Sequence, residues 1–394
     1  MKRSTNRILT THVGSLPRPD DLLSMMVARD MGQPYDAQAL ANLVRKEVAD
    51  VVRKQAEIGL DIIDDGEFGK PNFIFYVNDR LSGFEPSDTP SGLGWSGTRE
   101  TESFPEYYKE QAEQNKGVRI LGAAAATVCT GPVQYKGQKL LQTDLDNLKA
   151  AIKDVKVEEA FVPAISPGNV LVGKVNKYYK STEEFRAAVA DAMREEYKAI
   201  VDAGFLVQID DPHFVTNYIR NPKLTLQECR QMSEEHVELL NYALRGIPED
   251  RIRFHTCYSI NIGPRIHDME LKDIVDIMTK IRAQAYSFEA GNPRHDHEWR
   301  VWQNVKLREG QLLIPGVITH SNVLVEHPQL VADRLVRFAN AVGRENVIAG
   351  ADCGFGTMAT VKEIHPTIVW EKFKSLVEGA RIASQQLWGR AVSS

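Results

Sequence analysis

The chain has 394 residues, a formal net charge of −5 at pH 7 and 43% hydrophobic residues. This apolar fraction is enough to form the core of one large domain, which excludes a disordered protein. Lysine and arginine are spread along the chain without the basic stripe that binding to a phosphate backbone needs, so nucleic acid is not an expected partner. Because no apolar stretch has the length of a membrane span or of a signal-peptide core, we expect a cytoplasmic protein with reduced thiols and no membrane partner.

Short runs rich in Val, Ile, Leu and Phe alternate along the chain with longer segments of helical apolar spacing, which predicts parallel βα units. The predicted strands are 8–13, 60–67, 161–166, 206–210, 252–257, 285–289, 313–319 and 347–352. The predicted amphipathic helices are 37–58, 182–203, 225–245, 271–283, 328–342 and 366–387. Eight βα units predict an α/β protein with the (β/α)8 TIM-barrel fold.

A long segment between the second and third predicted strands does not fit this alternation. Residues 118–128 form a ninth apolar run followed by turn signals, so we assign them to an inserted hairpin beside the barrel. Residues 85–116 lack clear periodicity and predict a loop excursion, of the kind that forms lids or interaction surfaces. We therefore predict one catalytic TIM-barrel domain over residues 1–394, with an insertion at about 85–150.

Polar residues gather at the carboxyl ends of the predicted strands, where a TIM barrel has its active site. The residues in these positions are His12, Ser15, Asp64, Asp65, Glu67, Asp210, Asp211, His255, Cys257, Glu289, His320, Asp352 and Cys353. A random scatter of polar residues would not produce this clustering, so we expect the site at this end of the barrel.

Three of these residues have side chains that zinc prefers. His255 and Cys257 are two residues apart and therefore point to the same face of a strand, while Cys353 follows another strand among small glycines. Imidazole nitrogen and thiolate sulfur suit zinc, and Glu289 is the candidate for one further, acidic ligand. From these residues alone two readings stay open, a catalytic zinc site or a buried histidine with two inert core cysteines.

The composition of this ligand set favours sulfur chemistry. Two thiolates and a carboxylate make a zinc site net negative, hence a poor Lewis acid but a good holder of an electron-rich thiolate. If an incoming thiol replaces the carboxylate, the charge at the metal is unchanged and the nucleophile is a thiolate at neutral pH. Activation of water would more naturally use three mostly neutral ligands.

Seven motifs of the chain are similar to those of a known family. They are Val13-Gly-Ser-Leu-Pro17, Asp65-Gly-Glu67, Gln208-Ile-Asp-Asp-Pro212, His255-Thr-Cys-Tyr258, Phe288-Glu289, Thr319-His-Ser321 and Asp352-Cys-Gly354. With them the chain resembles the catalytic barrel of cobalamin-independent methionine synthase, in the superfamily that also contains uroporphyrinogen decarboxylase and epoxyalkane:coenzyme M transferase. The likeness covers nearly the whole chain except residues 85–116.

The resemblance implies roles for individual residues. The implied zinc ligands are His255, Cys257, Glu289 and Cys353. His320 corresponds to the catalytic general acid, and Ser15, Glu67 and Asp210 correspond to the residues that hold the amino-acid thiol substrate. Without the resemblance, Ser15 would be a turn residue, and the two acids would be ion-pair partners at the barrel mouth.

The chain also departs from methionine synthase. We expect no second, N-terminal barrel of the kind that helps bind a polyglutamylated methylfolate, which disfavours a folate donor. The sequence does not identify the alkyl donor among a methylfolate, a methyl-carrying corrinoid protein, a sulfonium, a methoxyaromatic compound and an epoxide. Residues 292–299 instead resemble short single-barrel paralogues. In this run Arg294 is expected to pair with an anionic substrate group, and His295 and His297 are expected to be substrate contacts or solvent-facing rather than metal ligands.

Four functions remain as hypotheses. The leading one is zinc-dependent transfer of an alkyl group, specifically methyl, to a small-molecule thiol such as homocysteine. An alternative is ring opening of an epoxide by coenzyme M, whose sulfonate would need cations such as Arg18, Lys70 or Arg294. Less favoured are a metal-free decarboxylase, against which His255 and the two cysteines argue, and a non-enzymatic zinc-stabilised binding protein.

Overall fold

The computed structural model describes residues 1–86, 96–116, 120–121, 127–258, 262–361 and 364–389. Eight parallel strands form one sheet in the order β1-β11-β10-β9-β8-β7-β5-β2. A parallel bridge between Thr11 and Ile62 joins the ends of this order, which closes the sheet into a barrel. The barrel strands are β1 (Leu9–Thr10), β2 (Ile62–Ile63), β5 (Glu159–Ile165), β7 (Leu206–Asp210), β8 (Ile252–His255), β9 (Ala285–Phe288), β10 (Leu312–Ile318) and β11 (Ile348–Ala351).

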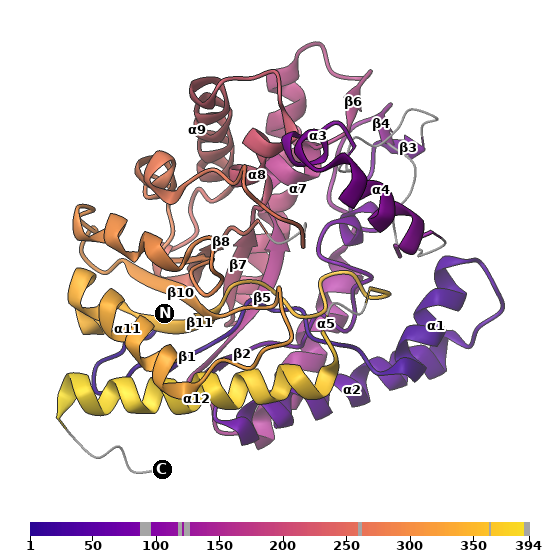
Figure 1. Ribbon diagram of the computed structural model, residues 1–394. Coiled ribbons are helices and arrows are strands. Elements are labelled where there is room, and N and C mark those ends of the chain that lie inside the picture. Colours follow the sequence, from indigo (N-terminus) through magenta and orange to yellow (C-terminus); the bar gives the residue numbers. More distant parts are fainter. Residues whose placement is uncertain (87–95, 117–119, 122–126, 259–261, 362–363, 390–394) are drawn as a thin grey trace.

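The predicted TIM barrel is confirmed, and each of the eight predicted strand runs overlaps one barrel strand. Helices surround the strands, with α2 and α12 running side by side along one edge of the barrel (Figure 1). The longer helices are α1 (Asp20–Asp30), α2 (Ala37–Ile58), α5 (Gln138–Ala151), α7 (Thr182–Asp202), α8 (His213–Arg220), α9 (Leu226–Ala243), α11 (Pro328–Val342) and α12 (Pro366–Trp388).

Local capping explains where these helices begin and end. The Asp36 carboxylate accepts the backbone N–H groups of Gln38 and Ala39 at the start of α2, which ends at Gly59 with a left-handed φ of 97°. A capping box between Thr225 and Glu228 begins α9. The His327 side chain likewise accepts the Gln329 N–H at the start of α11. These signals lie in the local sequence, which is why the predicted bounds of α2 and α11 agree with the structure.

The predicted helix at 271–283 is wrong in extent. A 3-10 turn, Leu271–Asp273, and the short helix α10 (Val275–Met278) replace it. The backbone of Ile274, with a φ of −135°, leaves the helical region between them. The apolar side chains of this segment pack into the core without a continuous helix, so its periodicity predicted a longer element than the chain forms.

The excursion before β5 contains more regular structure than the predicted loop. Two helices, α3 (Arg99–Ser103) and α4 (Pro105–Gln114), lie in it, and α4 buries none of its residues. A helix that buries no face needs no apolar periodicity. The signal on which the sequence analysis relied is therefore missing from α4.

A small sheet lies beside the barrel, with β3 (Phe84–Pro86) antiparallel and β6 (Val175–Asn176) parallel to β4 (Thr127–Cys129). The apolar run predicted as a hairpin, 118–128, falls partly outside the described residues, and its described end belongs to β4. Because β4 pairs with strands distant in sequence, the element is a three-stranded sheet rather than a hairpin. The prediction of one domain over residues 1–394 stays a prediction.

Apolar side chains fill the barrel below the polar strand ends. This inner cluster consists of Leu9, Ile62, Phe161, Leu206, Ala285, Leu312, Ile314 and Ile348. Arg253 lies above it, 4.0 Å from the Phe161 ring, and donates to Thr11 Oγ1 and to the His12 carbonyl. Among the described residues, no helix is both long and apolar enough to cross a bilayer.

Gly316 in β10 allows the close approach of β11 next to Cys353, a candidate metal ligand. A Cβ atom at residue 316 would lie 2.2 Å from Asp352 Oδ1 and 2.6 Å from the Asp352 backbone N and Cα. We expect Gly316→Ala to cost at least about 1–3 kcal/mol of unfolding free energy, because backbone atoms must move to relieve the clash.

The measurement for Gly316→Ala is the midpoint of thermal unfolding. Gly131→Ala is the matched control, because a Cβ at residue 131 meets only the Gly83 Cα at 3.7 Å, an ordinary contact. Equal midpoints for the two variants would contradict the tight packing of β10 against β11.

Candidate metal centre and substrate cavity

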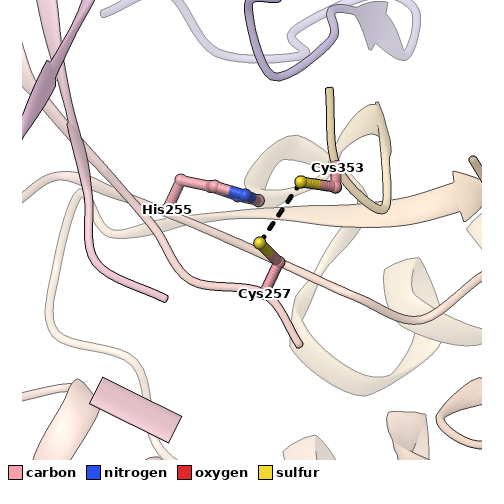
Figure 2. Close-up of side chains that lie close together, drawn as sticks. All are labelled: His255, Cys257 and Cys353. Carbon is pink, nitrogen blue, oxygen red and sulfur yellow. Dashed lines mark hydrogen bonds between the residues drawn. The ribbon is translucent and has the colours of Figure 1, made fainter. Parts of the chain in front are cut away.

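His255, Cys257 and Cys353 meet at the carboxyl end of the barrel. Among the described residues, they are the group whose metal-ligating atoms all lie within 4.8 Å of one another, and all three are buried. Figure 2 shows the His255 ring directed toward the two sulfurs, which are 3.2 Å apart. His255 ends β8 and Cys353 follows β11, so the closure of the barrel brings these residues together.

The orientation of the His255 ring leaves one of its nitrogens available to bind a metal ion. Its Nδ1 lies 3.0 Å from Ser287 Oγ, and its buried Nε2 has no hydrogen-bond partner among the described residues. A hydrogen bond to one ring nitrogen fixes the direction of the other, which is how proteins orient metal-binding histidines. The buried Nε2 atom therefore has the environment of a ligand atom.

The surroundings of Cys257 favour its thiolate form. The hydrogen bond with Cys353 and the positive charge on His255 lower the pKa of the Cys257 thiol to about 5, against the effect of burial. Burial disfavours the charged form of His255, but the Cys257 thiolate raises the His255 pKa. The lowered pKa of Cys257 favours the thiolate, the form that binds metal ions.

The three side chains fit a tetrahedral metal ion. Ligand atoms at the usual zinc distances are roughly 3.3–3.8 Å apart, and the sulfurs of Cys257 and Cys353 already lie 3.2 Å apart. Three protein ligands leave a fourth position open, which is the pattern of catalytic rather than structural zinc sites. Thiolate and imidazole together are donors for zinc and not for magnesium or calcium.

Glu289, the acidic ligand predicted from the sequence, follows β9 next to this group but is not one of its members among the described residues. Its carboxylate accepts hydrogen bonds from the Tyr258 backbone N at 2.6 Å, from Arg265 Nη2 at 2.8 Å and from Asn292 Nδ2 at 2.7 Å. Its charge nevertheless acts on the Cys257 thiol. The structure thus places Glu289 beside the site and holds it through other partners.

The substrate-binding residues predicted from the sequence open onto the same cavity as the ligand group. The lining residues are Val13, Ser15, Glu67, Phe73, Asp210, Pro212, His255, Cys257, Cys353, Gly354 and Thr357. The cavity has a volume of about 20 Å³, which is room for one water molecule or one ion. Ser15, Glu67 and Asp210 therefore face the candidate metal centre.

Glu67 is held in a strained backbone conformation. Its φ of 59° is rare for a residue with a side chain, and such residues concentrate at functional sites. Its N–H donates to Asp65 Oδ1 at 2.9 Å, and its carbonyl accepts from Arg18 Nη2 at 2.7 Å. The buried Oε2 atom of Glu67 has no hydrogen-bond partner among the described residues, so the carboxylate is positioned for a ligand.

Asp210 ends β7, and its Oδ1 accepts a hydrogen bond from Gln208 Nε2 at 2.8 Å. Burial raises the pKa of Asp210 to about 8, and the nearby Glu67 carboxylate adds to the increase. Two buried acids with a shared cavity repel each other when both are charged. A cationic group such as an ammonium would relieve this repulsion, so the pair is suited to hold one.

Gly354 lets the Cys353 loop reach the loop after β1. A Cβ at residue 354 would lie 2.0 Å from Ser15 Oγ, and the Phe355 N–H donates to the Ser15 carbonyl at 2.8 Å. A residue with a side chain at position 354 would push these loops apart. Ser15 and Cys353 therefore share a wall of the cavity because of this glycine.

Besides Glu289, two residues with predicted roles lie outside the set that lines the cavity. His320 is buried immediately after β10, and Arg294 is exposed on the loop after β9, where its guanidinium lies 3.4 Å from the Ile266 carbonyl. The catalytic role of His320 and the anion-binding role of Arg294 stay predictions.

The two histidines near Arg294 differ from each other. His297 is exposed, as expected. His295 is buried, with Nδ1 at 2.7 Å from Glu298 Oε2 and Nε2 at 3.0 Å from Asp268 Oδ2, and it stacks on the Tyr258 ring. Its solvent-facing alternative is therefore wrong, because two buried acids hold this imidazole inside the protein.

Arg18 and Lys70, two of the cations expected to bind a sulfonated substrate, form hydrogen bonds with backbone carbonyls instead. The Arg18 guanidinium donates to the carbonyls of Gly356, Glu67 and Lys70, and Lys70 Nζ donates to the Pro163 carbonyl at 2.6 Å. Neither side chain lines the cavity. The described cavity wall therefore presents acids rather than these cations to a substrate.

Sequence reasoning did not find several residues that support the site. Ser287 lies two positions before Glu289 in β9, so strand alternation could have suggested that it faces the same side. Of the two side chains that donate to Glu289, Arg265 carried no periodic or motif signal, and Asn292 was noted only as the first residue of the run 292–299. Their positions depend on loops whose path the sequence pattern does not encode.

Comparisons with known proteins point to one family. Residues 8–101 match the family model described as the catalytic domain of cobalamin-independent synthase. The methionine synthase of Thermococcus kodakarensis is 24% identical over 385 residues, which cover 96% of this chain and 94% of that protein. These similarities support the cobalamin-independent methionine synthase family for this chain. The resemblance to this family that the sequence motifs predicted is therefore confirmed.

Members of the family differ in length. A 5-methyltetrahydropteroyltriglutamate–homocysteine methyltransferase of Thermotoga petrophila is 22% identical, and the match covers 88% of this chain but 41% of that protein. The solved B12-independent methionine synthase from Shewanella sp. W3-18-1, in complex with selenomethionine, has a TM-score of 0.70 at 17% identity and covers 98% of this chain and 100% of its own. This chain shares the fold and the length of the shorter members of the family.

Proposed function

We propose that this member of the cobalamin-independent methionine synthase family is a zinc-dependent methyltransferase whose acceptor is the thiol of homocysteine. One observation carries the proposal: the His255, Cys257 and Cys353 ligand atoms share a cavity with Ser15, Glu67 and Asp210. Relatives that match over nearly their whole length are named methionine synthases, which supports the same acceptor.

Different residues of the cavity would bind the metal ion and the substrate ammonium. His255, Cys257 and Cys353 would hold zinc, which lowers the pKa of a bound thiol so that the sulfur is a thiolate at neutral pH. Glu67 and Asp210 would hold the substrate ammonium, since both acids are buried in the cavity wall. Two contacts at opposite ends of one small molecule fix the direction of its sulfur toward the methyl donor.

The acidic wall of the cavity disfavours coenzyme M as the acceptor. A sulfonate would meet the Glu67 carboxylate and the Asp210 carboxyl group, while Arg18 and Lys70 donate to backbone carbonyls. Like charges in a buried site raise the free energy of binding. The methyl donor stays open, and the methyl-carrying corrinoid protein among the candidates stays a prediction.

Metal analysis and zinc X-ray absorption test this proposal. We expect freshly purified protein to contain close to one equivalent of zinc with two sulfur ligands, and homocysteine to add one sulfur ligand. Coenzyme M at the same concentration should add none. Less than about half an equivalent of zinc, or a sulfur gained only from coenzyme M, would overturn the proposed metal or the proposed acceptor, respectively.

A further inference from the structure

Glu289 lies in a buried polar cluster next to the three ligand residues. The Arg265 and Glu289 side chains are 5% and 0% exposed, and Arg265 Nη2 lies 2.8 Å from Glu289 Oε2. Asn292 Nδ2 donates to the same oxygen, and the Tyr258 N–H donates to Oε1. Both carboxylate oxygens thus have strong donors that a metal ion would have to replace.

Arg265 is itself held firmly. Its φ of 58° places it in the left-handed region, which a residue with a side chain keeps only when its surroundings enforce it. Its Nε donates to Asp268 Oδ2 at 2.9 Å, and its backbone N–H donates to Glu100 Oε2 at 3.0 Å. Glu100 is buried in α3, so the excursion beside the barrel fixes the loop that carries Arg265.

The hold on this loop extends to α8. Glu100 Oε1 also accepts the His267 N–H at 3.0 Å, and the neighbouring Arg99 donates to the carbonyls of Tyr218 and Asn221 at 2.9 and 3.3 Å. Backbone strain at Arg265 is therefore balanced by contacts from two helices. A guanidinium fixed in this way is a permanent positive charge beside Glu289 rather than a surface side chain that happens to reach it.

We propose that Arg265 is a positioning residue that competes with zinc for the Glu289 carboxylate and so keeps the fourth metal position available to the incoming thiol. The inference rests on the proposed function. When a third thiolate joins Cys257 and Cys353, a carboxylate displaced from the metal would be a buried, unpaired charge, which is costly. Arg265 and Asn292 supply the alternative partners that make Glu289 displaceable.

Charge balance gives the direction of the effect. Without the guanidinium, Glu289 keeps its negative charge but loses its main counter-ion, so the metal ion becomes its best remaining partner. Zinc should then bind more tightly, and an incoming thiol should displace the carboxylate less readily. A residue that only stabilised the fold would have the opposite effect on zinc affinity, because a loosened site binds metal more weakly.

The experiment compares wild-type protein with Arg265→Met and with Glu100→Ala. Methionine removes the charge and keeps much of the side-chain volume. Glu100→Ala is the matched control, because it removes two hydrogen bonds to the backbone of the same loop but keeps the Arg265 side chain and its charge. Zinc affinity is measured by competition with a chelator, and zinc X-ray absorption counts oxygen and sulfur ligands with and without homocysteine.

We expect Arg265→Met to bind zinc about tenfold more tightly than wild type, the size of one lost hydrogen bond to a charged group, and to keep an oxygen ligand at homocysteine concentrations that displace it in wild type. Glu100→Ala should not tighten zinc binding. Unchanged or weaker zinc binding in Arg265→Met, or equally tight binding in Glu100→Ala, would overturn the inference.

Asn292→Ala provides a second variant if Arg265→Met does not fold, because it removes the other side-chain donor to Glu289 Oε2. It should tighten zinc binding in the same direction, and weaker zinc binding would count against the inference. The two proposals fail separately. A wild-type protein that binds zinc but gains no sulfur from homocysteine overturns the acceptor, while the chelator comparison still decides the role of Arg265.

Discussion

Replacing Cys353 with serine should remove both the metal and the activity while the barrel stays folded. Cys353 supplies one of two sulfurs in a group whose ligand atoms lie within 4.8 Å of one another, and a serine hydroxyl is a poor zinc ligand at neutral pH. Loss of an outer-shell partner already costs about 10–100-fold in metal affinity, so loss of a ligand should cost more. We expect zinc content near zero and at least about a 1000-fold loss of turnover.

The measurements for Cys353→Ser are metal content, methyl transfer to homocysteine and circular dichroism. Cys229→Ser is the matched control, because Cys229 is a buried cysteine on α9 that does not belong to the metal-ligand group. The control should keep zinc and turnover. Activity in Cys353→Ser close to wild type would show that the reaction does not depend on this site.

Replacing Glu67 with glutamine should weaken recognition of the homocysteine amino group. The substitution keeps the size of the side chain and removes the charge at a cavity-lining position. A hydrogen bond between charged groups contributes about 1.5–3 kcal/mol, which corresponds to roughly a 10- to 150-fold lower kcat/KM. Asp210→Asn should change kcat/KM in the same direction, since Asp210 lines the same cavity.

A substrate analogue separates ammonium binding from general damage to the site. The analogue is 4-mercaptobutyrate, which is homocysteine without its amino group. Wild-type protein should lose kcat/KM by about the same factor with this analogue as Glu67→Gln loses with homocysteine, and the variant should barely distinguish the two thiols. A variant that still prefers homocysteine by the wild-type factor would refute the proposed contact.

The strand pattern of this protein could be predicted from its sequence because barrel strands are buried on both faces. Their runs of β-branched and large apolar residues stand out against helices whose capping residues, such as Asp36 and Thr225, mark their starts. The prediction of helices from apolar periodicity was wrong where the periodicity of a segment did not match its burial or its backbone. The exposed helix α4 has no apolar face, and the buried residues around α10 do not form a long helix.

Much of the candidate site could also be found in the sequence. The two-residue spacing of His255 and Cys257 places both on one face of a strand end, and the barrel rule points to the same end for Glu67 and Asp210. The structure brings all four residues to one cavity. The approach of Cys353 to His255 and Cys257 depends on the closure of the barrel, because β9 and β10 lie between β8 and β11 in the sheet.

The sequence by itself determined the kinds of ligand and the end of the barrel where they lie, because alternation along a strand and the direction of parallel strands are local properties of the chain. Only the tertiary structure decided which groups contact the charged side chains next to the ligand residues. The contact of Glu289 with Arg265 and the left-handed backbone of Glu67 depend on loops that are fixed by distant segments. Such contacts are set by packing between remote residues, for which one sequence carries no periodic signal.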